Sequence, residues 1–352
     1  MADGMTPFRV IQSHAAEQGS ADLSSAGLDA TQPGVFGQGA GGQGTSSGGA
    51  SAIRQTTLKN AIHCSGVGVH GGQKTCMTLK PAEADSGILF RRSDLPGQPT
   101  IPALWSQAVE SPLCSRIVAR DCDASVSTIE HLMAALLGCG IDNVLIEIDG
   151  PEVPIMDGSA APFVFLIECA GIAQLDSARK AIKVLKPVEV SEPHRTARLL
   201  PYDGFAVDFA IHFDSKAVGG QRFACEVTPT SFKQEISRAR TFGFLHEVDE
   251  LRKLGLAKGG SLDNAVVVDD DVILNAGGLR YSDEFVRHKA LDSIGDLYMA
   301  GRPLIASFQG DKAGHALTLR LLQALFAKAS NYTEVELVES SVSDELLLAA
   351  GA

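Results

Sequence analysis

Three ionisable side chains recur at a spacing of four near the end of the chain. On a helix, His288, Asp292 and Asp296 would line one face, about 5–6 Å from one another. An imidazole and a carboxylate one turn apart can share a divalent ion, and a carboxylate one turn further can orient a ligand. The alternative is a solvated polar stripe. Apolar neighbours such as Leu291 and Ile294 favour partial burial instead, and a buried pair of carboxylates needs a cation.

A second group of reactive side chains stands at residues 127–132. Ser127 and Glu130 have the spacing of a capping box, in which the Glu130 side chain would only bond the backbone N–H of Ser127. In the other interpretation, Glu130 and His131 supply a base and a ligand to one ion from the start of a helix. The spacing allows both interpretations, and at this point both stay open.

Two further histidines follow glycine-containing segments. His315 comes after a loop at residues 310–314 and can reach into a cleft as an acid or a charge stabiliser, although a lone histidine more often packs or caps. His70 lies in the glycine cluster 66–72, which can border a pocket. This cluster lacks the lysine and the strand-to-helix context of a phosphate-binding loop, so nucleotide hydrolysis is not supported.

Periodicity predicts the elements that must position these side chains. Apolar residues at helical spacing predict a helix over 127–137, and Ser159 and Ser282 are the expected caps of helices over 159–171 and 282–300. A fourth helix is expected to begin near His315. Alternating apolar segments predict strands, at residues 76–80, 88–90, 143–148, 183–185, 205–211 and 304–308.

The order of these elements repeats. Each half of the chain has strands, then a histidine-bearing helix that ends at a glycine, then a strand and another helix, which indicates a duplicated α+β unit. We expect the units at residues 54–177 and 178–340. Residues 1–53 are rich in Gly and Ser and are expected to form a flexible leader, because they can bury little apolar surface.

Composition excludes several classes of protein. The 352 residues include 42 acidic and 30 basic side chains, a formal charge of −12 that argues against nucleic-acid binding. No apolar run approaches the roughly 18 residues that span a bilayer, and the first residues do not resemble a secretory signal. Seven scattered cysteines without a C-x-x-C pair indicate reduced thiols, so a cytoplasmic protein is expected, with any metal held by His, Asp or Glu.

Taken together and in order, these segments resemble the UDP-3-O-acyl-N-acetylglucosamine deacetylases, the zinc enzymes of the committed step in lipid A biosynthesis. The resemblance covers residues 54 to about 330. Its motifs stand at residues 57–59, 66–70, 127–132, 154–163, 237–244, 259–261, 285–289, 293–297 and 314–317. Two departures from the family pattern are the leader and the pair Gly71 and Gly72, and neither affects the inferred chemistry.

The resemblance implies a role for each matched residue. The zinc ligands would be His131, His288 and Asp292, with Glu130 as the general base. His315 would act as acid or charge stabiliser with Asp296 behind it. Thr241 and Lys289 would line the same cleft, with Thr241 helping to bind the oxyanion. Residues expected to contact the substrate are Phe213, Phe242, Lys289 and Lys312, with Phe213 and Lys312 near the uridine and diphosphate.

The resemblance also implies the architecture and the reaction. Two similar β-α-α-β sandwich units would pack helix face to helix face after a disordered leader, and an insert at about 242–271 would form a passage for the acyl chain. The expected reaction is hydrolysis of the 2-acetamido group of UDP-3-O-(3-hydroxyacyl)-N-acetylglucosamine by a monomer. The expected cofactor is one Zn²⁺ per chain, with Fe²⁺ as the alternative in the cell. The rival hypotheses are a zinc amidohydrolase for another acylated amine and a non-catalytic binder of lipids or nucleotide sugars.

Overall fold

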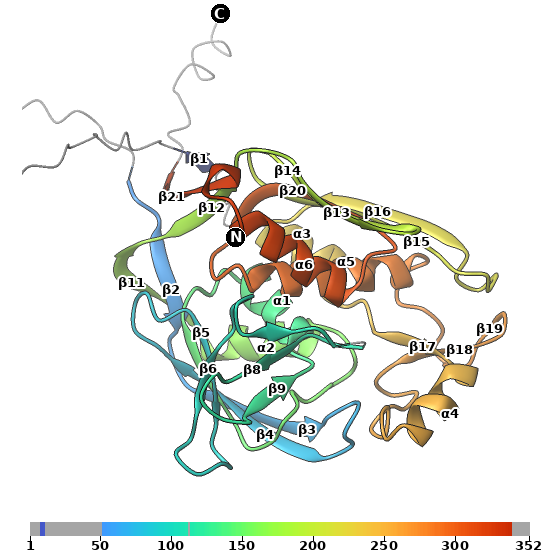
Figure 1. Cartoon of the computed structure of the whole chain (residues 1–352). Helices are drawn as coiled ribbons and strands as arrows, with labels where there is room; N and C mark the ends of the chain where they lie inside the picture. The colour runs from blue at the N-terminus through green and yellow to red at the C-terminus, as the bar shows by residue number, and fades with distance from the viewer. Residues whose placement is uncertain (1–7, 11–50, 112, 340–352) are drawn as a thin grey trace, which may run out of the picture.

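The computed structural model describes residues 8–10, 51–111 and 113–339. They form an α+β structure in which strands of two large sheets lie on the outside and the main helices lie between them (Figure 1). Most of the expected leader at residues 1–53 lies outside the described residues. Its described segment Phe8–Val10 forms β1, an edge strand antiparallel to β21 (Tyr332–Glu339).

The first large sheet has five strands in the order β3-β4-β10-β5-β6. Its middle strand, β10, buries Val144, Ile146 and Ile148, because alternate side chains of a strand point to one face. β10 is antiparallel to β4 and parallel to β5. The strands are β3 (Ile62–Val67), β4 (Lys74–Pro81), β5 (Ile88–Arg92), β6 (Thr100–Pro102) and β10 (Val144–Ile148).

Two helices belong to this half of the structure and pack against each other, α1 (Glu130–Gly138) and α2 (Ala161–Ala170). The N-cap of α2 is Ala160 and not the expected Ser159, whose hydroxyl instead accepts from the Ala161 N–H at 3.3 Å. Smaller sheets complete this half. They are the pair β2 (Arg54–Leu58) and β11 (Ile172–Ala178), and the three strands β7 (Ala108–Val109), β8 (Arg116–Val118) and β9 (Ser125–Ser127).

The second large sheet has eight strands, including β1 and β21. β20 lies near its middle, antiparallel to β14 and parallel to both β12 and β15. The strands expected over 183–185, 205–211 and 304–308 all belong to it. Its other members are β12 (Lys180–Val184), β13 (Val188–Glu192), β14 (Arg195–Leu200), β15 (Phe205–His212), β16 (Gly220–Glu226) and β20 (Leu304–Asp311).

Helices α5 (Glu284–Tyr298) and α6 (His315–Phe326) lie on the inner side of this sheet (Figure 1). The prediction that Ser282 caps this helix is wrong, because α5 begins at Glu284 with Asp283 at the N-cap position. A tertiary ion pair holds this helix start instead. The fully buried Glu284 carboxylate accepts from the Arg240 guanidinium at 2.8 Å and from the Arg280 backbone N–H at 2.6 Å.

Helices α1 and α5 pack directly on each other, and Gly295 makes this contact possible. A Cβ atom at Gly295 would lie 1.9 Å from the backbone oxygen of Glu130 and 3.1 Å from the backbone nitrogen of Ala134. Real Cβ atoms do not approach backbone this closely, so only glycine allows the two helices to touch here. The contact places the first turn of α1 beside the polar face of α5.

A small subdomain projects from the second half of the chain (Figure 1). It consists of β17 (Phe242–Phe244), α4 (Leu245–Lys253), β18 (Val266–Asp269) and β19 (Val272–Ile273), with the three strands in one sheet. Its surface carries exposed apolar side chains, including Leu254, Leu262 and Val272. Three short helical segments lie elsewhere, at Pro229–Ser231 (α3), Phe232–Ile236 (a π-helix) and Ala329–Asn331 (a 3-10 helix).

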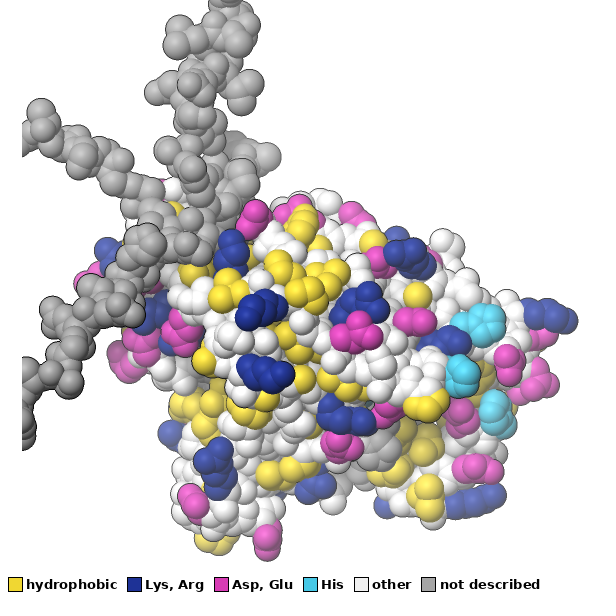
Figure 2. Space-filling model, turned by 45° about the horizontal axis from the view of Figure 1, so that its top comes forward, with side chains coloured by type: hydrophobic (Ala, Val, Ile, Leu, Met, Phe, Trp, Pro, Cys, Tyr) yellow, Lys and Arg dark blue, Asp and Glu magenta, His cyan; other side chains and the backbone are white. Residues whose placement is uncertain are grey.

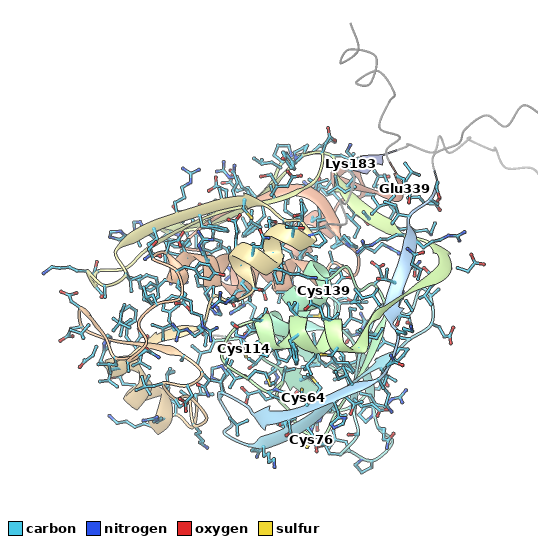
Figure 3. All side chains as sticks on the ribbon, turned by 180° about the vertical axis from the view of Figure 1, so that it is seen from behind. Cys64, Cys76, Cys114, Cys139, Lys183 and Glu339 are labelled. Carbon is cyan, nitrogen blue, oxygen red and sulfur yellow. The ribbon has the colours of Figure 1, made fainter. Side chains whose placement is uncertain are left out.

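The last features of the fold are the lengths of its helices, the charges on its surface and the state of its cysteines. Every helix in the described part of the chain is too short or too polar to cross a bilayer. Basic and acidic side chains are interspersed on the face drawn in Figure 2. All seven cysteines are free, and Cys64 and Cys76 lie on the neighbouring strands β3 and β4 (Figure 3). Burial raises the pKa of the Cys64 thiol to about 11, so this thiol stays protonated and unreactive.

Candidate metal centre and its acid–base groups

Three side chains from the two packed helices converge on one point. His131 comes from α1, and His288 and Asp292 come from adjacent turns of α5. Their ligand atoms all lie within 4.8 Å of one another, and all three residues are buried. Asp292 Oδ1 is 3.4 Å from His131 Nε2 and 3.2 Å from His288 Nε2. The three predicted metal ligands are therefore close enough to bind a common ion.

The hydrogen bonds of these groups fit a divalent cation. Asp292 Oδ1 is buried and has no hydrogen-bond partner among the described residues, which is unfavourable unless another group binds it. His288 Nδ1 lies 3.1 Å from the Ala239 carbonyl, which assigns the ring proton to Nδ1 and leaves the Nε2 lone pair facing the cluster. Two imidazoles and a carboxylate are a ligand set typical of catalytic zinc.

The charge states of these groups also suit a metal. Burial lowers the pKa of His288 to about 4, so its imidazole is neutral at neutral pH and can act as a ligand. Burial opposes the charge of Asp292, but the neighbouring His288 and Lys289 outweigh this effect and hold the pKa of Asp292 well below its usual value. Lys289 Nζ donates to Asp292 Oδ2 at 2.6 Å. Lys289, which was predicted to place a positive charge in the cleft, therefore pairs directly with one of the predicted metal ligands.

Glu130 stands beside this cluster and does not form the capping box. Ser127 belongs to β9, and its N–H donates to the Pro151 carbonyl. Thr128 then takes a left-handed conformation with φ 58°, which turns the chain so that Ile129 is the residue before the helix. The Glu130 carboxylate is free to point inward, where Oε2 accepts from the Ser115 N–H at 3.0 Å. Burial raises the pKa of Glu130, as a general base near neutral pH requires.

His315 faces the cluster from the first residue of α6. Its Nδ1 lies 2.8 Å from Asp296 Oδ2, and its Nε2 lies 4.0 Å from Glu130 Oε1 and 3.9 Å from Asp292 Oδ2. Burial opposes the charge of His315, but Asp296 outweighs it and, with Glu130 and Asp292, raises the pKa of His315 to about 9. The imidazole is therefore charged at neutral pH and can stabilise negative charge or donate a proton.

The remaining predicted site residues are Phe213, Phe242, Thr241 and Lys312. The Phe242 ring is 6.3 Å from the His288 ring, and the Phe213 ring is 5.7 Å from Phe242, so these aromatic side chains form one wall beside the cluster. Thr241 precedes Phe242, and its backbone joins Gly158 to Val266. Lys312 is exposed, on the turn between β20 and α6, three residues before His315.

Other residues of the site have no motif that points to them. Ser115 contacts both Glu130 and Asp296. Glu152 accepts from the backbone N–H groups of His70 and Gly71, and from the Thr128 hydroxyl. These bonds join the glycine cluster to the start of α1. A signal was available only for Gly295, because a glycine inside a strongly predicted helix suggests a close packing contact.

Gly295→Ala is expected to lower the free energy of unfolding by about 1–3 kcal/mol, because the new methyl group must separate α1 from α5. In an exposed helix, the same change would stabilise the protein by about 1 kcal/mol. Metal affinity and activity should fall as well, since His131 would move away from His288. Denaturant unfolding and metal content measure these effects.

Gly277→Ala is the control, because a Cβ at Gly277 would meet no atom within 4 Å. A Gly295→Ala variant that is as stable as this control and the parent protein would contradict the packing argument.

Comparisons with known proteins agree with this geometry. Residues 55–327 match the family described as LpxC: UDP-3-O-acyl N-acetylglycosamine deacetylase. A UDP-3-O-acyl-N-acetylglucosamine deacetylase of Acidithiobacillus ferrooxidans is 49% identical over 304 residues, which are 85% of this chain and 99% of that protein. Proteins of the same name from Idiomarina loihiensis and Stenotrophomonas maltophilia are 48% and 45% identical, over 83% and 85% of this chain and 95% and 99% of their own lengths.

Proposed function

Because this chain belongs to the UDP-3-O-acyl-N-acetylglucosamine deacetylase family, we propose that it hydrolyses the 2-acetamido group of UDP-3-O-(3-hydroxyacyl)-N-acetylglucosamine. The products are acetate and the free amine, and the reaction is the committed step of lipid A biosynthesis. One observation carries the proposal. Asp292 Oδ1 is buried between the His131 and His288 imidazoles, with Glu130 beside them, and has no hydrogen-bond partner among the described residues. A binding protein would not need this base.

His131, His288 and Asp292 would hold one divalent ion, Zn²⁺ or, in the cell, Fe²⁺. When bound, Zn²⁺ would polarise the acetamide carbonyl and lower the pKa of a water molecule to about 7. Three protein ligands would leave room for a water molecule on the ion, as in catalytic rather than structural zinc sites. All other steps rely on groups of the protein itself.

Glu130 acts as the general base. Its Oε2 is occupied by the Ser115 N–H, so Oε1 is the oxygen that can take a proton from the attacking water. His315, charged through its contact with Asp296, holds the negative charge that develops on the carbonyl oxygen, with the Thr241 hydroxyl as a second donor. Either Glu130 or His315 can return the proton to the leaving amine.

The pH profile of kcat/KM should be bell-shaped. Glu130 must be deprotonated, so activity is lost as pH falls through its raised pKa. His315 must be protonated, so activity is lost as pH rises through a pKa of at most about 9. A bound divalent ion would shift both limbs to lower pH. The carboxylates that raise the pKa of His315 are Asp296, Glu130 and Asp292, and Asp296 contributes most.

Asp296→Asn is the variant that tests this assignment. It should move the basic limb to lower pH, because His315 loses the carboxylate that favours its charge. A basic limb at the same pH in both proteins would reject His315 as the group that must be protonated.

The substrate would lie between the cluster and the small subdomain at 242–271. We propose that Phe213 and Phe242 contact the substrate beside the cluster, and that Lys289 and Lys312 offset the formal charge of −12 near the diphosphate. The subdomain would cover the acyl chain. Burial of about ten methylene groups would contribute roughly 8 kcal/mol, enough to select an acylated substrate.

Release of acetate from the acylated UDP-sugar tests the function. We expect turnover that disappears after treatment with a chelator and returns on addition of Zn²⁺. UDP-N-acetylglucosamine without the acyl chain is the matched control and should be hydrolysed with a kcat/KM lower by orders of magnitude. Equal rates for the two substrates would reject the acyl passage, and no acetate from either would reject the proposed reaction.

The finer architecture is also part of the proposal. We infer two similar sandwich units at residues 54–177 and 178–340, because the strands of residues 54–178 and those after Arg179 pair into different sheets. A monomeric state stays a prediction. A cytoplasmic location is also a prediction, which the free thiols of all seven cysteines support.

A further inference from the structure

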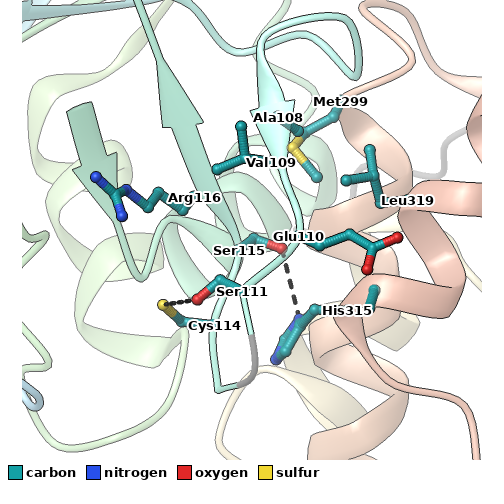
Figure 4. A pocket seen from close by; sticks show the side chains of 11 residues that line it. Ala108, Val109, Glu110, Ser111, Cys114, Ser115, Arg116, Met299, His315 and Leu319 are labelled. Atoms are coloured by element: carbon teal, nitrogen blue, oxygen red, sulfur yellow. Dashed lines mark hydrogen bonds between the residues drawn. The ribbon is translucent and has the colours of Figure 1, made fainter. Parts of the chain in front are cut away.

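Ser115 contacts both carboxylates on which proton transfer depends. It lies just before β8, 4% exposed, on the wall of a small cavity that also contains His315 (Figure 4). Its backbone N–H donates to Glu130 Oε2 at 3.0 Å. Its hydroxyl donates to Asp296 Oδ1, and Ser115 Oγ also lies 3.5 Å from His315 Nδ1. One small residue thus touches three of the acid–base groups.

These two bonds determine which carboxylate oxygens remain available. Asp296 uses Oδ1 for the Ser115 hydroxyl and Oδ2 for His315 Nδ1. The plane of the Asp296 carboxylate is therefore set from two sides, and it holds the His315 ring with Nε2 toward the cluster. Without the hydroxyl, Asp296 is free to rotate and a buried Oδ1 loses its partner, which is unfavourable for a charged group.

Ser115 itself is held in place independently of its hydroxyl. Its carbonyl accepts from the Ile129 N–H at 3.4 Å, and the next residue, Arg116, pairs with Ser127 in the β8–β9 ladder. These backbone contacts tie Ser115 to the segment that leads into α1. Replacement of the side chain should therefore leave the backbone position and the bond to Glu130 unchanged.

We propose that Ser115 is a positioning residue for deacetylation, whose hydroxyl acts through Asp296 to orient His315. The inference rests on the function proposed above. It concerns the orientation of the acid–base groups and not the binding of the metal, because the Ser115 side chain bonds none of the three predicted ligands.

Ser115→Ala tests the inference in the zinc-loaded full chain. We expect kcat to fall about 10- to 100-fold, as for other residues that orient a catalytic group. KM should stay within about twofold and zinc content should match the parent protein, because the hydroxyl bonds neither substrate nor metal ligands. Tm should fall by a few degrees, because the buried Asp296 Oδ1 loses its partner. Ser115→Thr keeps the hydroxyl and should retain most of kcat.

A double-mutant cycle separates this role from a structural one. If the hydroxyl acts through Asp296, Ser115→Ala should change kcat less than about twofold in an Asp296→Ala background. Independent, multiplying effects would overturn the inference, and so would equal losses in Ser115→Ala and Ser115→Thr. Full activity of Ser115→Ala beside an active parent protein would also overturn it, whereas an inactive parent protein would reject the proposed function itself.

Discussion

Glu130→Gln is expected to lower kcat for acetate release by about 10²–10⁴-fold and to leave zinc content unchanged. Glutamine keeps the shape of the side chain and can still accept from the Ser115 N–H, but its amide cannot take a proton from water at neutral pH. Because Glu130 makes no hydrogen bond to the three predicted ligands, the metal should remain bound. Steady-state kinetics and metal analysis of the same sample measure both quantities.

A control distinguishes loss of the base from an unspecific effect of substitution. Glu83 is exposed, on the turn after β4, and Glu83→Gln should behave like the parent protein. If Glu130→Gln retained more than about a tenth of the parent kcat with zinc bound, Glu130 would not be the general base. The proton would then have to pass to a group other than Glu130.

His288→Ala is expected to remove both the metal and the activity. The variant loses one of three ligands, so zinc should fall from about one ion per chain to near zero after dialysis against a weak chelator. Activity should fall about 10³-fold or more, because the ion supplies several kcal/mol of transition-state stabilisation. Asp292→Ala should have the same effect and should also lower the free energy of unfolding, because the half-buried Lys289 ammonium loses its partner.

The matched control for this experiment is another histidine. His63 is exposed on β3, and His63→Ala should keep its zinc and its activity. Unchanged zinc content in His288→Ala would contradict the ligand assignment. If zinc were lost while activity remained, the reaction would not depend on this metal at all.

Much of the polar face of α5 could be predicted from the sequence. The spacing of His288, Asp292 and Asp296 depends only on the helical repeat, which is a property of the local chain. The same reason explains why the strands around 143–148 and 205–211 and the start of α6 at His315 were predicted. The helix starts were less accurate. Ser282 is not a cap, since Asp283 and the buried Glu284 determine where α5 begins.

Only the tertiary structure decided between the two interpretations of Glu130. Its spacing from Ser127 fits a capping box, but Ser127 is committed to the β8–β9 ladder and Thr128 turns the chain in a left-handed conformation. Sheet pairing therefore overrides the local preference, and the carboxylate points to the metal cluster. No short-range pattern contains this information.

The sequence by itself determined the types of the reactive residues, their family and the helix face on which His288 and Asp292 stand, because these follow from neighbours within a few positions. The tertiary structure alone decided that His131 lies beside His288 and Asp292, and that Ser115 bonds Asp296, 181 positions away. It also decided that α1 and α5 touch at Gly295. The physical reason is that such contacts depend on how closely two helices from distant parts of the chain can pack, and this distance is set by the whole core.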